Sequence, residues 1–186
     1  MYDQEKKDYL LKGAREIRYE AVHVDFLSKR DIEILTKTGL PDCLSPYTLI
    51  APGEQYGGYS LFDRITVFEK YPIDNEDFKN FCFFARNDYG YLVITREGEV
   101  CLLEDETEEL IYVNESLDAY LESAYEYLCF IDQLAEDYGE DAYIEGDYTE
   151  DDVFFLRDLL AKIDEAAVED GFWADELIKL IDDIEC

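Results

Sequence analysis

The chain has 186 residues, 48% of them hydrophobic, and it carries 47 acidic against 16 basic side chains, a formal net charge of −31. This apolar content excludes a disordered chain and predicts one domain of ordinary size with a packed core. The negative charge repels phosphate groups and anionic lipids, so we expect neither direct nucleic-acid binding nor membrane binding. Because residues 99–186 hold 30 of the acids and only 3 of the bases, we expect any acidic function in the second half.

The sequence also bears on the cellular compartment. The first eight residues contain no apolar run of the kind that signal peptides have, and nowhere do about 18 apolar residues follow one another. We therefore expect a cytoplasmic protein. The five cysteines are odd in number and widely spaced, which predicts reduced, partly buried thiols rather than a disulfide framework. They are Cys43, Cys82, Cys101, Cys129 and Cys186.

The first part of the chain changes from a helical to a strand pattern. Residues 5–36 have helical apolar spacing, as one helix or two, and Gly39-Leu40-Pro41 predicts the end of this segment. Short β-branched and aromatic runs follow, separated by turn residues with no helical pattern between them. They cover residues 47–50, 64–68, 81–86, 91–95, 100–103 and 110–113. Such closely spaced strands predict an antiparallel, meander-like sheet.

The surest element is a helix of about 22 residues that begins at Leu117. Its apolar positions recur alternately every four and three residues, and Gly139 ends the pattern. The predicted buried stripe consists of Leu117, Leu121, Ala124, Leu128, Ile131, Ala135 and Tyr138. Acidic residues fall off this stripe, so we expect the helix to bury an apolar seam against the sheet and to present acid to water.

A helical pair is predicted after this helix. Beyond a polar loop over residues 140–148, Thr149-Glu150-Asp151-Asp152 resembles a capping box and predicts the start of a helix. A last helix carries Trp173 and Ile184. The predicted fold is α+β, an antiparallel sheet flanked by N-terminal and C-terminal helices, with this pair in addition. We assign residues 1–138 to the α+β domain and residues 139–186 to an acidic helical extension packed on the same domain.

No pattern in the sequence points to catalysis or to a cofactor. His23 is the only histidine, and we interpret it as a structural residue because no partners for a catalytic base can be identified. Residues 141–152 space oxygen-bearing side chains roughly as a calcium-binding EF-hand loop does. Tyr143 at the third position and Asp152 at the twelfth depart from that pattern, so we favour a flexible acidic loop. We expect no catalytic residues, no metal and no cofactor.

Two acidic segments are interleaved with Tyr112, Tyr138, Tyr143 and Tyr148, a combination of charge and aromatic anchors that protein interfaces favour. They cover residues 104–109 and 136–152. A solubilising acidic face is the alternative interpretation. The candidate partner contacts are Glu104, Asp105, Glu106, Glu108, Glu109, Asp141, Glu145 and Asp147.

Three short motifs, in the same order as the predicted helices and strands, resemble those of a known protein family. They are Gly39-Leu40-Pro41 after the first helix, Thr95-Arg96-Glu97-Gly98-Glu99-Val100 between two strands, and Asn114-Glu115-Ser116-Leu117 before the long helix. In the last motif, Asn114 or Ser116 is expected to cap the helix. Over about residues 20–131 the chain resembles the SUKH superfamily, particularly its fourth immunity-protein subfamily. The segment Phe83-Phe84-Ala85-Arg86-Asn87 departs from relatives, which tend to have a glycine after an aliphatic residue.

The resemblance implies an immunity protein that binds and neutralises a cognate bacterial toxin, often a nuclease. A toxin that cuts nucleic acid needs a basic surface, and a strongly acidic protein complements that surface. The expected partner is therefore a toxin protein with a basic surface, bound by a monomer or a homodimer. Two alternatives remain open. One is a regulatory or scaffold module of the same fold with a constitutive protein partner, and the other is a small hydrolase that uses His23 or a carboxylate pair.

Overall fold

The computed structural model describes residues 26–40, 81–86, 89–104, 107 and 109–184. In chain order, its elements are α2 (Lys29–Glu33), the π-helix η2 (Ile34–Thr38), β1 (Phe81–Arg86), β2 (Gly90–Thr95), β3 (Val100–Glu104), β4 (Leu110–Asn114), α4 (Leu117–Tyr138), α5 (Ala142–Glu145), α6 (Glu150–Ile163), the 3₁₀-helix η5 (Ala166–Val168) and α7 (Phe172–Ile184). The predicted strands 47–50 and 64–68, His23 and the start of the predicted first helix lie outside the described residues.

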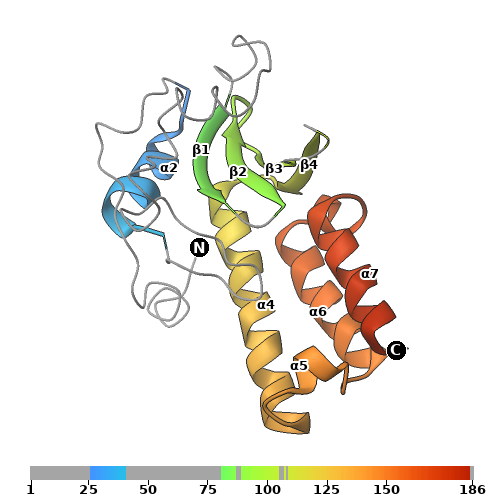
Figure 1. The fold of residues 1–186 in the computed structure, drawn as a ribbon. Coiled ribbons are helices and arrows are strands. Elements are labelled where there is room, and N and C mark those ends of the chain that lie inside the picture. Colours follow the sequence, from blue (N-terminus) through green and yellow to red (C-terminus); the bar gives the residue numbers. More distant parts are fainter. Residues whose placement is uncertain (1–25, 41–80, 87–88, 105–106, 108, 185–186) are drawn as a thin grey trace.

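Strands β1 to β4 form an antiparallel sheet in which each strand pairs with the next (Figure 1). This confirms the α+β class and the meander order, and each of the four strands lies within one residue of its predicted bounds. The glycine hairpin between β2 and β3 is also present, since the Gly98 amide donates to the Thr95 carbonyl oxygen at 3.1 Å.

Within the described part of the first helical segment, Ser28 is in an extended conformation and precedes the start of a helix. The Ser28 hydroxyl accepts from the Asp31 amide at 3.1 Å, and the Asp31 carboxylate accepts from the Ser28 amide at 3.1 Å. This capping box starts α2 at Lys29, and the helical path runs through η2 to Gly39. The pattern over residues 5–36 is therefore not one continuous helix, and the predicted stop at Gly39 is confirmed.

Helix α4 has the predicted bounds, but its buried stripe changes course halfway. Ser116 caps its start by accepting from the Ala119 amide, which settles the choice between Ser116 and Asn114. The first half buries the predicted side chains. In the second half Tyr127, Phe130 and Leu134 are buried, whereas the predicted Leu128 and Ile131 are only partly buried against the core. The prediction was wrong there because this half packs on the C-terminal helices rather than on the sheet.

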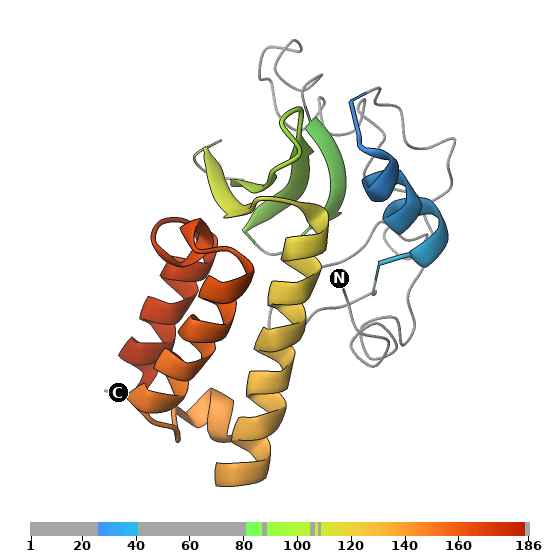
Figure 2. The same cartoon turned by 180° about the vertical axis from the view of Figure 1, so that it is seen from behind.

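The C-terminal helices lie alongside α4, on the opposite side of it from α2 (Figures 1 and 2). Helix α6 contacts α4, while η5 and α7 contact β4. The predicted capping box opens α6, with the Thr149 hydroxyl accepting from the Asp152 amide and the Asp152 carboxylate accepting from the Thr149 amide. The predicted loop over residues 140–148 instead contains the short helix α5.

A single hydrophobic cluster joins the sheet to the helices. It includes Leu35 of η2, Phe84 of β1, Leu117 of α4, Leu156 of α6 and Trp173 of α7. Aromatic contacts tie α4 to the C-terminal helices, with ring centroids 5.6 Å apart for Tyr127 and Trp173 and 6.2 Å apart for Phe130 and Tyr148. Within the described residues, no helix is long and apolar enough to cross a membrane.

Candidate partner-binding surface

The first predicted acidic segment borders the connection between β3 and β4. Glu104 ends β3 and is partly exposed, and Glu109 is exposed just before β4. Thr107 links the two, because its hydroxyl donates to the Glu104 carboxylate and accepts from the Glu109 amide. Asp105, Glu106 and Glu108 lie outside the described residues. Hydrogen bonds of Thr107 therefore join the two residues that flank this connection and carry the described carboxylates.

The second predicted segment surrounds α5, and its carboxylates are exposed. Asp141, Glu145 and Asp147 all point to solvent, and Ile144 between them is 81% exposed. The structure shows no cation paired with any of these three carboxylates among the described residues. An exposed isoleucine among free carboxylates gives this segment both charge and apolar area for a partner.

The backbone of this segment is held against α7 from behind. The buried Tyr148 donates its hydroxyl to the Leu180 carbonyl oxygen at 3.1 Å. Gly146 has φ +69°, and a Cβ at this position would lie 2.4 Å from the Asp183 carbonyl oxygen, so only glycine allows this approach. The α5 carboxylates thus project from a fixed backbone rather than from the flexible loop that was predicted.

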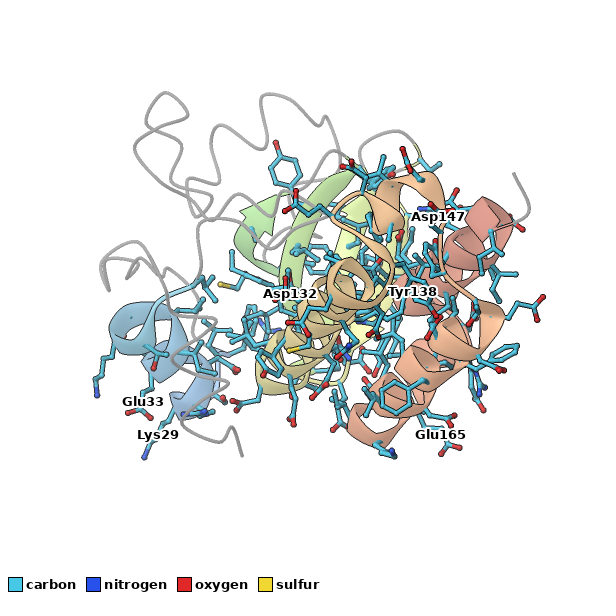
Figure 3. The ribbon with its side chains drawn as sticks, turned by 90° about the horizontal axis from the view of Figure 1, so that it is seen from below. Lys29, Glu33, Asp132, Tyr138, Asp147 and Glu165 are labelled. Atoms are coloured by element: carbon cyan, nitrogen blue, oxygen red, sulfur yellow. The ribbon has the colours of Figure 1, made fainter. Side chains whose placement is uncertain are left out.

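The two acidic segments belong to different parts of the surface. Both views place α5 at the end of α4 that is remote from the sheet, whereas Glu104 and Glu109 border the sheet (Figures 1 and 2). Seen from below, Asp147 lies on the opposite side of the molecule from α2, whose Lys29 and Glu33 are labelled (Figure 3). A partner that covers both segments would have to span the helical layer.

The tyrosines between the acidic residues have mainly structural roles, which corrects their interpretation as surface anchors. Tyr148 is buried, and Tyr143 is half-buried with its hydroxyl 3.3 Å from that of Tyr127. Tyr112 is partly buried and donates to a buried carboxylate. Only Tyr138 of the four proposed anchors is exposed, at 47%, and its hydroxyl donates to Asp152. The most exposed aromatic side chain among the described residues is Phe155 of α6, at 65%.

The segment that resembles an EF-hand uses its last carboxylate to cap a helix. One oxygen of Asp152 accepts from the Thr149 amide, the Thr149 hydroxyl and the Tyr138 hydroxyl. Burial raises the pKa of Asp152, but these hydrogen bonds outweigh it and leave the pKa below its ordinary value. Among the described residues, no group of three or more His, Cys, Asp or Glu side chains is placed to hold a metal ion.

Behind the surface, a buried polar network joins the sheet to the C-terminal helices. The fully buried Asn114 donates its amide to Ser123 at 3.2 Å and to Asp164 at 3.3 Å, and its oxygen accepts from the Trp173 indole at 2.9 Å. The Asp164 carboxylate also accepts from the Tyr112 hydroxyl at 2.9 Å and from a backbone amide at 2.8 Å. Burial, followed by the bond to Asp164, raises the pKa of Tyr112, which keeps its phenol as the donor.

The connection between α6 and α7 is pressed onto the same strand. Gly171 has φ +117°, and a Cβ there would lie 2.4 Å from the Tyr112 carbonyl oxygen. Sequence reasoning found none of this network, because it assigned Asn114 only a possible capping role. The one signal available was a polar residue at the end of an apolar strand, which does not identify distant partners.

The described cysteines are Cys82 and Cys101, which are buried, and Cys129, which is partly buried, and this confirms the burial that was predicted for them. Burial and the nearby charges of Glu99 and Glu97 raise the pKa of Cys101 to about 11, so its thiolate is scarce at neutral pH. Cys82 is 1% exposed. Cys43 and Cys186 lie outside the described residues.

The antiparallel sheet, the long helix packed on it and the exposed carboxylates together define an acidic α+β protein. The chain matches the SUKH-4 immunity protein family over residues 13–180, and it belongs to that family. The matched range includes α4, α5, α6 and most of α7. No curated protein and no solved structure matches the chain.

Proposed function

We propose that the protein is an immunity protein that binds a cognate bacterial toxin through its acidic surface and thereby neutralises it. The toxin in this proposal has a basic surface, as a nuclease domain does. The proposal rests on one observation, which is that the chain belongs to an immunity protein family and is strongly acidic. Its last 88 residues hold 30 acids and 3 bases. Binding alone accounts for neutralisation, so the proposal includes no catalytic step and no cofactor, and it places the protein in the cytoplasm.

The α5 segment supports this proposal by its geometry. Asp141, Glu145 and Asp147 are exposed without cation partners among the described residues, on a backbone that Tyr148 fixes to α7. A fixed backbone loses little conformational freedom when a partner binds, so less of the interaction free energy is lost to ordering. Opposite charges on the two surfaces would chiefly accelerate association and exclude wrong partners. Glu104 and Glu109 at the sheet are the second group of proposed contacts.

The first experiment tests neutralisation itself. Toxin genes adjacent to the gene for this protein are expressed in a bacterial host with and without it, and survival is counted. Survival that depends on the protein supports the proposal. If it protects against none of these toxins, the immunity function is wrong, and the regulatory or scaffold alternative becomes the better explanation.

The second experiment tests the acidic contacts. Asp141→Asn, Glu145→Gln and Asp147→Asn are combined, and association with the neutralised toxin is followed by stopped flow across a salt series. We expect slower association at low salt and a smaller salt dependence. The matched control combines Glu165→Gln, Glu169→Gln and Asp170→Asn, which removes the same charge from exposed positions near the sheet. Equal effects of both variants would show that only the total charge matters and would exclude α5 as the contact.

A further inference from the structure

Two adjacent phenylalanines lie on the outer face of α6, where a helix of a soluble protein normally carries polar residues. The Phe155 side chain is 65% exposed and that of Phe154 is 48% exposed. Neither belongs to the hydrophobic core, because α6 contributes Val153, Leu156 and Leu160 to it from the other side of the helix. Exposed aromatic side chains of this size are typical of binding surfaces.

Acidic residues lie between the two rings on the helix surface. Asp151 and Asp158 are each three or four positions from both phenylalanines, so helical geometry makes them neighbours of both rings. Two exposed basic residues lie beside these rings, Lys162 one turn beyond Asp158 and Arg157 three positions from Phe154. The outer face of α6 is therefore an apolar pair with carboxylates at its centre, which we call the Phe154–Phe155 patch.

We propose that the Phe154–Phe155 patch is the anchor that inserts into an apolar pocket on the basic surface of the toxin. This inference rests on the proposed immunity function and names the residues that hold the partner. Few residues supply most of the affinity in a protein interface, and large aromatic side chains with surrounding polar residues are the usual ones. When the rings enter the pocket, Asp151 and Asp158 also lose water. Because a carboxylate without water needs a cation nearby, the partner must supply Arg or Lys side chains around the pocket.

Charge decides in favour of a basic partner over a second copy of this chain. A two-fold dimer would place the same patch on both sides of the interface. Asp151 and Asp158 of one copy would then face the same carboxylates of the other, in a protein that already carries a net charge of −31. A basic toxin surface turns this repulsion into attraction.

The experiment measures the dissociation constant for the toxin that the wild-type protein neutralises in the co-expression assay. We expect the combined variant Phe154→Ser and Phe155→Ser to bind at least about 100-fold more weakly and to lose protection. Ile178→Ser is the matched control, because Ile178 is similarly exposed, at 56%, but lies on α7 and is not among the proposed contacts. The control should bind as the wild type does.

Thermal unfolding of the double variant shows whether weaker binding comes from loss of the fold. Because both side chains are exposed, their replacement should leave the midpoint of unfolding unchanged. A double variant that is folded and binds within threefold of the wild type would overturn the patch while leaving the immunity function intact. A wild-type dimer that dissociates in the double variant without loss of protection would also overturn it and would assign the patch to self-association. If the wild type protects against no toxin, the immunity function and this inference fail together.

Discussion

The two ends of α4 place carboxylates in opposite situations. At the sheet end, Asp164 is 7% exposed and its charge is met by three hydrogen-bond donors. At the far end, Asp141 and Glu145 are exposed and have no cation partner among the described residues. The same residue types thus stabilise the fold at one end and are available to a partner at the other. The two roles differ because hydrogen-bond donors surround the buried carboxylate, whereas water surrounds the exposed ones. The number of charges in the sequence does not show this difference.

The largest expected effect is at Asp164. Replacing Asp164 with Ala removes the acceptor for the Tyr112 hydroxyl, the Asn114 amide and the Glu115 backbone amide in a site that water cannot fill freely. We expect the free energy of unfolding to fall by about 3 kcal/mol. Urea denaturation measures this loss.

Glu165→Ala is the control for Asp164→Ala, because Glu165 is the next residue and is exposed (Figure 3). It should change stability by less than about 0.5 kcal/mol. Hydrogen exchange adds a regional test of the proposal that residues 139–186 are packed as one domain with the sheet. If Asp164→Ala raises exchange only in α6 and α7 while the sheet stays protected, the C-terminal helices unfold separately and that proposal is wrong.

A smaller loss is expected at the start of α6. Thr149→Ala removes the hydroxyl that accepts from the Asp152 amide, and the capping box is lost. The cost should be about 1 kcal/mol, because the helix end is exposed and water replaces part of the bond. Thr149→Ser keeps the hydroxyl and should restore most of the stability in the same urea experiment. Equal losses for Ala and Ser would mean that the methyl group, not the cap, carries the effect.

These contrasts show which features can be predicted from sequence. The capping box at Thr149, the strand bounds and the length of α4 depend on residues a few positions apart, and the structure confirms them. The role of Asn114 depends on Asp164 and Trp173, which are 50 and 59 residues away, so local patterns could not show it. The change in the α4 stripe has the same cause, because it follows from packing against helices whose positions the sequence did not give.

Some features of the candidate surface could be predicted from the sequence, and others could not. That residues 141–147 are acidic was readable from the sequence, but their fixed backbone depends on the contact of Tyr148 with Leu180, 32 positions away. The exposure of Phe154 and Phe155 could have been predicted, since both fall off the stripe of Val153, Leu156 and Leu160.

A buried carboxylate on α7 gives a prediction about pH. Glu176 is 2% exposed, and burial raises its pKa above the ordinary value, helped by the charge of Asp183 and opposed by the hydrogen bond from Lys179 at 2.7 Å. A raised pKa in the folded state means that folding favours the protonated form. The stability that this provides is complete below the ordinary pKa and is lost as the pH rises through the folded-state pKa.

Glu176→Gln should therefore gain stability relative to the wild type as the pH rises from 5 to 8. We expect a difference below about 1 kcal/mol, because the half-exposed Lys179 compensates the charge. Urea denaturation gives the free energy of unfolding of both proteins at each pH. The difference between the two values removes the contribution of the other acidic residues, because both proteins share them. A difference that stays constant with pH, or that changes in favour of the wild type, would show that Lys179 holds Glu176 ionised at no cost.

The smallest effect is expected where the carboxylates are exposed, at α5. The variant that combines Asp141→Asn, Glu145→Gln and Asp147→Asn leaves no donor unpaired, so its stability should lie within about 0.5 kcal/mol of the wild type. At low salt the change should be a slight gain, because a chain with a net charge of −31 repels itself, and 0.5 M salt should abolish that gain. A large loss of stability would mean that these carboxylates make structural contacts, and they would then no longer be free for a partner.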